Sequence, residues 1–282
     1  MTAAPEPRVL LDGLAYVESP RWHHGRLWFA HWGVGEIVAV GLDGRHEQVA
    51  AGPHGVGWSF DWLPDGPLLL TGEGLSRQLP DGSRQEHASL ADLSDDWNEI
   101  VVDGRGNIYV NGGCDFDAGP GDPPGVLALV RPDGSVEQVG DALAFPNGMA
   151  VTPDNATLLV AESFANRITA FDIDGDGTLS NRRVWAAVDG FPDGICLDAA
   201  GAVWFADVPN QRCTRIREGG EVLDEIALDR GCFACLLGGP DRRTLFLLSA
   251  KWGGPDGMDE EFEHRTGRVS VAEVEVPGVG WP

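Results

Sequence analysis

Long apolar runs and basic residues are scarce in this sequence of 282 residues. No stretch approaches the ~20 apolar residues that cross a membrane. Residues 1–14 (MTAAPEPRVLLDGL) lack the basic segment followed by an apolar run that marks a secretory signal. Lysine and arginine number 20 against 44 aspartates and glutamates, a formal charge of -24 that repels phosphate backbones and anionic lipids. We therefore expect a cytoplasmic protein with no nucleic-acid or membrane partner.

Cysteine is also rare, and its number is odd: the five are Cys114, Cys196, Cys213, Cys232 and Cys235. An odd count in a long chain does not suggest a disulfide scaffold, so we expect reduced thiols. Cys232-x-x-Cys235 could be half of a zinc site, but no second pair exists. Buried structural cysteines are the favoured interpretation.

Common catalytic motifs are missing as well. The sequence has no G-x-S-x-G elbow, H-E-x-x-H helix, Walker loop or G-x-G-x-x-G turn. Lys251 is the only lysine, which leaves Schiff-base chemistry a single candidate. Motif-based hydrolase and nucleotide-binding classes are therefore not indicated.

A repeat runs through the whole chain. Helical periodicity is almost absent, whereas short β-rich runs bounded by Gly, Pro and Asp recur. Six stretches share an apolar strand, a tight turn and a second apolar strand: residues 16–30, 58–71, 97–110, 146–160, 192–206 and 234–248. Their turns, at Gly25, Gly66, Gly106, Asn155, Gly201 and Arg243, are separated by 41, 40, 49, 46 and 42 residues. This period is that of a four-stranded propeller blade.

The six units predict an all-β fold, a six-bladed β-propeller, formed by residues 1–282 as a single domain. Most units add an outer hairpin with its own turn, as in GLDG (41–44) and LPDG (79–82). We expect the ring to close by pairing of the chain ends, with PRVLLDG (7–13) completing the unit that ends in GRVSVAEVEV (267–276). A Kelch or WD-type binding propeller stays an alternative, although no Gly-His or Trp-Asp signature repeats.

The segment FDIDGDGTLSN (171–181) begins like an EF-hand calcium loop, with Asp172, Asp174 and Asp176 before a glycine. Position 12 of such a loop should be a bidentate glutamate, and here it is Arg183. The preceding RITAF alternates polar and apolar residues as a strand does. Because the segment occupies the outer-hairpin position of the fourth unit, we interpret it as an Asp/Gly turn.

The channel of the predicted ring carries the candidate site. The innermost strand of each blade lines the channel, and its first residues lie near one mouth. Counting back seven or eight residues from each turn selects the positions that should face one another there: Glu18, Ser59, Asn98, Asn147, Asp193 and Cys235. Four of these six carry the carboxylate or amide oxygens that hard divalent cations prefer.

Two explanations of these polar channel residues are open. Unpaired carboxylates in a narrow channel are costly unless a cation or solvating water balances them. A central metal site, with calcium as the preferred ion, is the favoured prediction, and a water-filled channel is the alternative.

Five segments, in order along the chain, carry a family resemblance: ESPRW (18–22), WNEIVVDGRGNIYV (97–110), FPNGMAVTPDNATLLVAES (145–163), FPDGICLDAAGAVWFAD (191–207) and GCFACLLGGPDRRTLF (231–246). With them the sequence resembles the SMP-30/gluconolactonase/luciferin-regenerating-enzyme family over essentially its whole length. The resemblance implies a six-bladed propeller with one central divalent metal held by Glu18, Asn147 and Asp193. It implies for Asn98 a role as a further ligand or as a contact to metal-bound water or substrate.

The resemblance also bears on the ion and on the reaction. It leaves calcium, zinc, manganese and magnesium open. It implies hydrolysis of lactones, sugar lactones in particular, or of organophosphate esters.

The sequence departs from the family pattern in a way that bears on the substrate. The usual Asn-Asp pair is Asn98-Glu99 here, and Asp96 stands where relatives that hydrolyse sugar lactones can carry an arginine. This argues against an aldonolactone. A less polar substrate is suggested by a set of aromatic residues, although packing is the favoured role for each one taken singly: Trp32, Trp58, Trp97, Phe116, Phe145 and Trp252.

Further candidate substrate contacts are Asp96, Asp115, Phe116, His31 and Trp32. His31 and Trp32 follow the second strand of the first unit and could face either mouth. Asp115 and Phe116 follow the second strand of the third unit, in the long loop 111–125. Loops of this length, such as this one and 250–266, are often functional lids or disordered segments.

We expect a divalent-metal-dependent hydrolase that opens a lactone, a cyclic ester, by metal-assisted attack of water. The cation would act as a Lewis acid at the carbonyl oxygen. Asp193 is the expected group for positioning or deprotonating the water, with Asn98 as the second catalytic candidate. Two alternatives stay open: a phosphotriesterase at the same centre, and a non-catalytic, metal-stabilised propeller that binds a ligand. The expected partner is a small-molecule lactone or ester, and the sequence does not indicate an oligomeric state.

Overall fold

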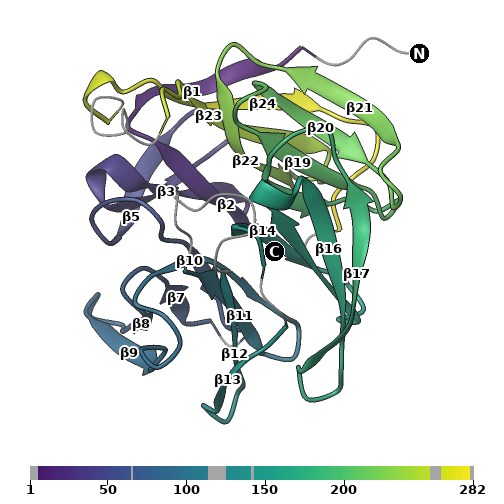
Figure 1. Cartoon of the computed structure of the whole chain (residues 1–282). Coiled ribbons are helices and arrows are strands. Elements are labelled where there is room, and N and C mark those ends of the chain that lie inside the picture. Colours follow the sequence, from purple (N-terminus) through teal and green to yellow (C-terminus); the bar gives the residue numbers. More distant parts are fainter. Residues whose placement is uncertain (1–5, 65, 114–124, 141–142, 255–261, 280–282) are drawn as a thin grey trace.

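Six antiparallel sheets of four strands make up the protein, which is described here from a computed structural model. The description covers residues 6–64, 66–113, 125–140, 143–254 and 262–279. Each sheet is one blade of a β-propeller, and the blades follow one another around a ring (Figure 1). The predicted six-bladed all-β fold is confirmed. Within the described ranges no helix has the length and apolar character needed to cross a membrane.

Blades 1 to 5 each contain four consecutive strands, numbered from the centre of the ring outward. Blade 1 contains β2 (Val17–His23), β3 (Arg26–His31), β4 (Glu36–Val40) and β5 (His46–Ala51). Blade 2 contains β6 (Phe60–Trp62), β7 (Leu68–Leu70), β8 (Leu75–Gln78) and β9 (Arg84–Ala88). Blade 3 contains β10 (Trp97–Val102), β11 (Ile108–Gly112), β12 (Val126–Val130) and β13 (Val136–Gln138).

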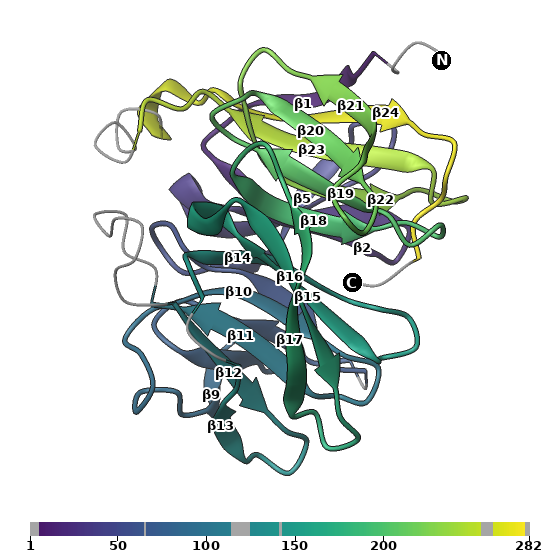
Figure 2. The same cartoon turned by 45° about the vertical axis from the view of Figure 1, so that its right-hand side comes forward.

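The remaining blades continue this order. Blade 4 contains β14 (Pro146–Val151), β15 (Thr157–Glu162), β16 (Arg167–Ile173) and β17 (Leu179–Ala187). Blade 5 contains β18 (Pro192–Leu197), β19 (Val203–Asp207), β20 (Arg212–Ile216) and β21 (Val222–Ala227). Two short 3-10 helices, η1 (Trp32–Val34) and η2 (Ser163–Ala165), follow β3 and β15. Figure 2 shows the outer strands β13 and β21 near opposite ends of the molecule, with β14, β18 and β2 between them.

Blade 6 joins the two ends of the chain. Its strands are β22 (Gly231–Gly238), β23 (Thr244–Ala250), β24 (Gly267–Glu273) and β1 (Arg8–Leu14). β1 pairs antiparallel with β24, from Arg8 opposite Val271 to Leu14 opposite Gly267 (Figure 1, purple beside yellow). Because this pairing gives blade 6 its fourth strand, the ring closes as the sequence predicted.

The hydrophobic core is divided among the spaces between neighbouring blades. Six clusters of buried side chains each combine residues of two adjacent blades. β23 shows how one strand serves both sides: Leu245 and Leu247 pack toward blade 5, and Phe246 and Leu248 pack toward blade 1. Alternate side chains of a strand point to opposite faces, so a blade between two others needs apolar residues at both. This arrangement explains the continuous apolar runs in the sequence.

Two smaller predictions concern a turn and the cysteines. The DIDGDG segment is the turn between β16 and β17, in which the Gly177 N–H donates to the Asp174 carbonyl over 3.0 Å. Arg183 neutralises Asp172 at 2.6 Å, so the interpretation as a turn is confirmed. The four cysteines in the described ranges are buried free thiols, as expected: Cys196, Cys213, Cys232 and Cys235. Cys114 lies outside the described residues.

Candidate metal centre and pocket

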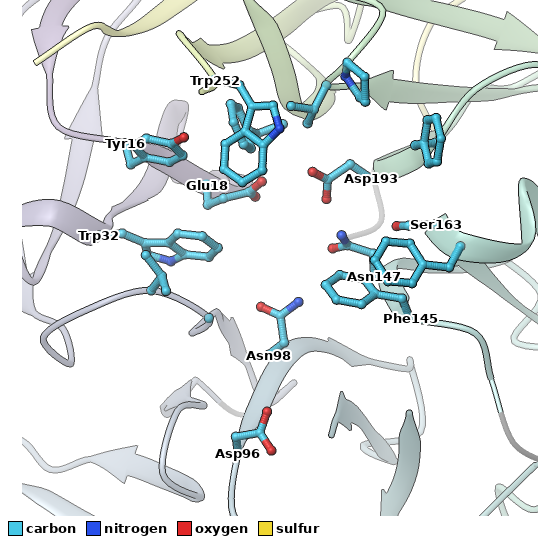
Figure 3. A pocket seen from close by; sticks show the side chains of 17 residues that line it. Tyr16, Glu18, Trp32, Asp96, Asn98, Phe145, Asn147, Ser163, Asp193 and Trp252 are labelled. Atoms are coloured by element: carbon cyan, nitrogen blue, oxygen red, sulfur yellow. The ribbon is translucent and has the colours of Figure 1, made fainter. Parts of the chain in front are cut away.

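The four predicted ligand residues occupy equivalent places in four blades. Each is the second residue of an innermost strand: Glu18 in β2, Asn98 in β10, Asn147 in β14 and Asp193 in β18. All four line one cavity of about 530 Å³. Figure 3 shows their carboxylate and amide groups directed toward a common space. The structure thus brings together four of the six residues that the repeat selected, and metal binding by them stays a prediction.

A β-bulge lies at each of these positions. The register moves from Trp97 opposite Gly112 to Ile100 opposite Val110, so that the inner strand holds one residue more than its partner. The same extra residue follows Glu18, Pro146 and Pro192 in the other three strands. A bulge rotates the local backbone and redirects side chains, and bulges are frequent beside active sites. The bulges therefore give these polar residues an orientation that differs from that of the apolar remainder of each strand.

Two glycines let the inner strands approach closely beside the ligand positions. A Cβ atom on Gly148 would lie 2.6 Å from both the Asp193 carbonyl oxygen and the Ile195 nitrogen. A Cβ atom on Gly194 would lie 2.7 Å from the Cα atom of Ala234. Each glycine directly follows a predicted ligand residue, and the close approach at Gly148 brings Asn147 and Asp193 together.

Replacement of Gly148 by alanine should therefore separate β14 from β18. We expect it to lower the free energy of unfolding by about 1–2 kcal/mol, as overpacking does, and to weaken cation binding. Denaturant unfolding and calorimetric titration with calcium measure the two effects. Gly175→Ala is the matched control, because a Cβ atom there meets nothing within 4 Å. Equal effects of the two substitutions would contradict the role of Gly148.

Two of the six predicted channel positions are not in the cavity. Ser59 precedes β6 and its hydroxyl donates to the Glu99 carboxylate over 3.1 Å. Cys235 is buried, with its sulfur 3.9 Å from that of Cys196. β22 has eight residues where β10, β14 and β18 have six, so a fixed count back from its turn stops short. Phe233 lines the cavity in blade 6 instead.

Burial raises the pKa of both carboxylates of the site. Burial, followed by the charges of Asp193 and Glu99, raises the pKa of Glu18 well above 4.5. Burial and the Glu99 charge likewise raise the pKa of Asp193 well above 3.8, against a hydrogen bond with Asn147 that lowers it. A divalent cation between the carboxylates would reverse these shifts, because its charge favours both ionised forms.

The donor set fits a hard divalent cation. The amide oxygen of Asn98 is buried and accepts no hydrogen bond from the described part of the protein. Buried polar atoms are almost always paired, so this oxygen requires a ligand or water as its partner. No three His, Cys, Asp or Glu side chains in the described residues form a metal-holding group. A cation at this site therefore needs the amide oxygens of Asn98 and Asn147 beside the two carboxylates, and an all-oxygen set suits calcium.

The four predicted ligand residues form the polar floor of the cavity. Aromatic side chains form its walls, in two tiers. The lower tier lies two residues before the floor positions and includes Tyr16, Phe145 and Phe191. The upper tier lies after the second strand of several blades and includes Trp32, Phe164 and Trp252. Tyr16, Phe233 and Trp252 pack together in one apolar cluster. The cavity thus combines four polar oxygen-bearing groups at its base with largely apolar sides.

The predicted substrate contacts divide into three groups. Asp96 and Trp32 line the cavity. Asp115 and Phe116 lie outside the described residues. His31 does not line it: its Nε2 accepts a hydrogen bond from the Ala15 N–H over 2.9 Å. Burial, together with the charges of Arg265 and His46, lowers the pKa of His31 to about 4, so the ring is neutral and can accept. The structure therefore corrects the prediction of His31 as a substrate contact.

His31 is one of three buried residues that bind the backbone just before an inner strand begins. Each is the last residue of a second strand and accepts a hydrogen bond from a backbone N–H two or three residues before a floor position. The pairs are His31 with Ala15, Glu162 with Ala144 and Asp207 with Phe191. These bonds fix where each inner strand begins, and so where its floor residue lies.

Four aromatic wall residues escaped the sequence analysis: Tyr16, Phe164, Phe191 and Phe233. A signal for the lower tier was present, because residues two apart in a strand point to the same side. Tyr16 and Phe145 also have positive φ angles of 48° and 55°. Bulky residues rarely adopt this conformation, and such strain concentrates at functional sites.

Comparison with known proteins identifies the family. The family model for the SMP-30/gluconolactonase/LRE-like region matches residues 16–251. The chain belongs to this family. Regucalcin of Xenopus laevis is 34% identical over 148 residues, which are 50% of this chain and 48% of that protein. The chain thus matches about half the length of that relative.

Two further proteins are similar over more of the chain. Pentonolactonase XacC of Haloferax volcanii is 28% identical over 235 residues, 77% of this chain and 76% of that protein. The solved structure of regucalcin from Agrobacterium tumefaciens, described as a calcium-binding protein, superposes with a TM-score of 0.79 at 21% identity. That superposition covers 99% of this chain and 97% of the other, and it shows the same fold.

Proposed function

We propose that the protein is a divalent-metal-dependent lactonase, with Glu18, Asn98, Asn147 and Asp193 as the ligands of the cation. The observation that carries this proposal is the convergence, in one cavity, of the Glu18 and Asp193 carboxylates and the Asn98 amide oxygen, which has no hydrogen-bond partner among the described residues. Relatives that carry the name of lactonases, among them the pentonolactonase, support the reaction class. Calcium is the proposed ion, because all four donors are oxygen atoms.

A bound divalent cation supplies Lewis-acid polarisation of the ester carbonyl and acidifies water. The residues of the chain supply positions and proton transfer. Asp193 holds the attacking water by a hydrogen bond to its carboxylate and accepts the proton as the water oxygen bonds to the carbonyl carbon. The ring C–O bond then breaks, and the same carboxylate returns the proton to the leaving alkoxide. Water and lactone give one hydroxy acid.

Asn98 has two functional atoms. Its amide oxygen faces the common space, and its amide N–H can donate to the substrate oxygen that gains charge during attack. Donors that are held in place before the reaction stabilise this charge better than mobile water does. The Glu99 side chain beneath is held by the hydroxyls of Ser19 and Ser59 over 3.2 and 3.1 Å, which keeps this part of the floor rigid.

The test is metal depletion followed by replacement. Elemental analysis of untreated protein identifies the ion, and a pH-stat assay with neutral lactones measures turnover before and after chelation. We expect at least a tenfold loss of kcat/KM on chelation and recovery with calcium. An aryl phosphotriester in the same assay tests that alternative substrate. Unchanged turnover after depletion would contradict metal dependence. Metal-induced thermal stabilisation with no turnover of any ester would favour a ligand-binding propeller.

A further inference from the structure

We infer that the pocket selects neutral lactones that carry an apolar, ring-sized substituent and discriminates against polyhydroxylated and anionic lactones. This inference rests on the proposed lactonase function and specifies its substrate class. Three independent features of the cavity support it: the shape and chemistry of its walls, the engagement of its polar wall atoms, and its charge.

The walls of the cavity present aromatic side chains to a substrate. Figure 3 shows Trp32 and Trp252 on one side of the polar floor and Phe145 on the other. Phe145 and Phe164 are held at a centroid distance of 4.5 Å with an interplanar angle of 30°. Phe233 and Trp252 pack edge to face at 5.8 Å and 78°. These ring contacts hold the walls in place, and a volume of about 530 Å³ leaves room beyond a single lactone ring.

The rim of the cavity exposes apolar surface. Phe191 and Val56 both line the cavity, yet they are 42% and 39% exposed, among the most exposed large apolar residues described. Apolar surface grouped at a concave site is typical of a ligand-binding surface. A substrate with an apolar substituent would cover these side chains and remove them from water.

Three polar side chains of the walls are already engaged within the protein. The Trp32 indole N–H donates to the Trp58 carbonyl over 2.7 Å. The Ser163 hydroxyl donates to the Pro192 carbonyl over 2.7 Å, and the Tyr16 hydroxyl donates to the Lys251 carbonyl over 3.4 Å. Sugar hydroxyls placed against these walls would lose water without gaining equivalent hydrogen bonds, which is unfavourable.

The charge of the cavity opposes anions. Three carboxylates line it, Glu18, Asp96 and Asp193, and the described lining contains no lysine or arginine. The segments outside the described residues contain neither of these residue types. One divalent cation leaves the lining with a net negative charge. Asp96 is the member of this set that lies away from the four-residue floor (Figure 3), so it acts on the substituent rather than on the reacting ester.

A lactone panel tests the substrate class. The wild-type protein with calcium is assayed on δ-valerolactone, its 5-phenyl derivative, glucono-δ-lactone and 6-phosphoglucono-δ-lactone, each rate being divided by spontaneous hydrolysis. We expect kcat/KM for the phenyl lactone to exceed that for gluconolactone at least tenfold, as burial of an apolar group permits. A higher value for gluconolactone or its phosphate would overturn the inference and leave the lactonase function intact. Absence of turnover for all four would contradict the proposed function itself.

Variants assign the selectivity to residues. Asp96→Asn should raise kcat/KM for the phosphorylated lactone relative to the neutral lactones about threefold or more at low salt. Asp95→Asn is the matched control, because it removes the same charge one residue away from Asp96, at a position that does not line the cavity. Phe164→Ala should lower the ratio of phenyl to unsubstituted lactone at least tenfold. Equal responses of the two aspartate variants, or an unchanged ratio in Phe164→Ala, would refute these assignments.

Discussion

Asp193→Ala is expected to abolish cation binding and to lower kcat/KM at least about 10³-fold, because the proposed mechanism uses this one side chain both as a ligand and as the proton acceptor. Asp193 contributes one of the two carboxylates among the four floor residues. A site left with Glu18 and two neutral amides has half the negative charge that attracts the ion. Calorimetric titration with calcium and a lactone assay measure the two losses.

Melting temperatures with and without a chelator distinguish loss of the cation site from loss of the fold. Chelation should lower the melting temperature of the wild-type protein and leave that of Asp193→Ala unchanged, because the variant has no cation to lose. Asp193→Asn keeps one oxygen donor and removes the proton acceptor, so it should retain some binding and lose turnover. Asp189→Ala, which removes a fully exposed carboxylate near the start of β18, is the control. Full activity in Asp193→Ala would exclude the proposed site.

The fold could be predicted because the repeat imposes the same physical constraint six times. Each blade packs against two neighbours, so its central strands are apolar on both faces, as Leu245 to Leu248 in β23 illustrate. Each hairpin then needs a tight turn at a regular interval. Closure followed from the same reasoning, because blade 6 lacks a strand that only the segment before blade 1 can supply.

The floor of the site was predictable where the distance from the turn back to the bulge varies little. The floor residue lies eight positions before the turn for Asn98, Asn147 and Asp193 and seven for Glu18, and a bulge lies there in all four strands. In blade 6 the inner strand is longer, and the count selected buried Cys235 in place of Phe233. Packing between blades decides the length of an inner strand. A fixed count along the sequence takes no account of that packing.

The walls were harder to predict because loops between second and third strands supply most of the upper tier. His31 and Trp32 show the difficulty. They are adjacent in sequence, and η1 begins at Trp32, so one side chain turns to the Ala15 backbone and the other to the cavity. Trp58 and Trp97, named among possible wall residues but individually expected to serve packing, are buried: Trp58 lies between blades 1 and 2, and Trp97 between blades 2 and 3. Aromatic character alone does not distinguish a wall residue from a core residue.

Glu162→Gln is expected to lower the free energy of unfolding by about 2–3 kcal/mol at pH 7, because it removes the charge from a fully buried carboxylate with two arginine partners. Glu162 accepts hydrogen bonds from Arg167 at 2.8 and 2.9 Å and from Arg182 at 3.2 Å. The estimate lies below the range for fully buried pairs, since both arginines are partly exposed. The melting temperature should fall by about 5–10 °C.

The pH dependence of this loss has a definite sign. Burial alone would raise the pKa of Glu162, but the hydrogen bonds from Arg167 and the Ala144 N–H outweigh it, and the pKa lies below 4.5 in the folded protein. The ionised carboxylate therefore stabilises the fold above pH 4.5, and this contribution is lost as the pH falls through the lowered pKa. The difference between Glu162→Gln and wild type should accordingly be full at pH 7 and shrink below pH 4.5.

Glu137→Gln is the matched control, because Glu137 pairs with Arg131 at 2.7 Å on the surface with half of its side chain exposed. That substitution should change the free energy of unfolding by less than about 1 kcal/mol, as surface pairs do. Of the two glutamates, only Glu162 accepts a hydrogen bond from the Ala144 N–H, three residues before Asn147. Only the Glu162 variant should therefore also weaken calcium binding. Equal losses of stability in the two variants, or a difference independent of pH, would show that the buried charge of Glu162 does not fix the entry to β14.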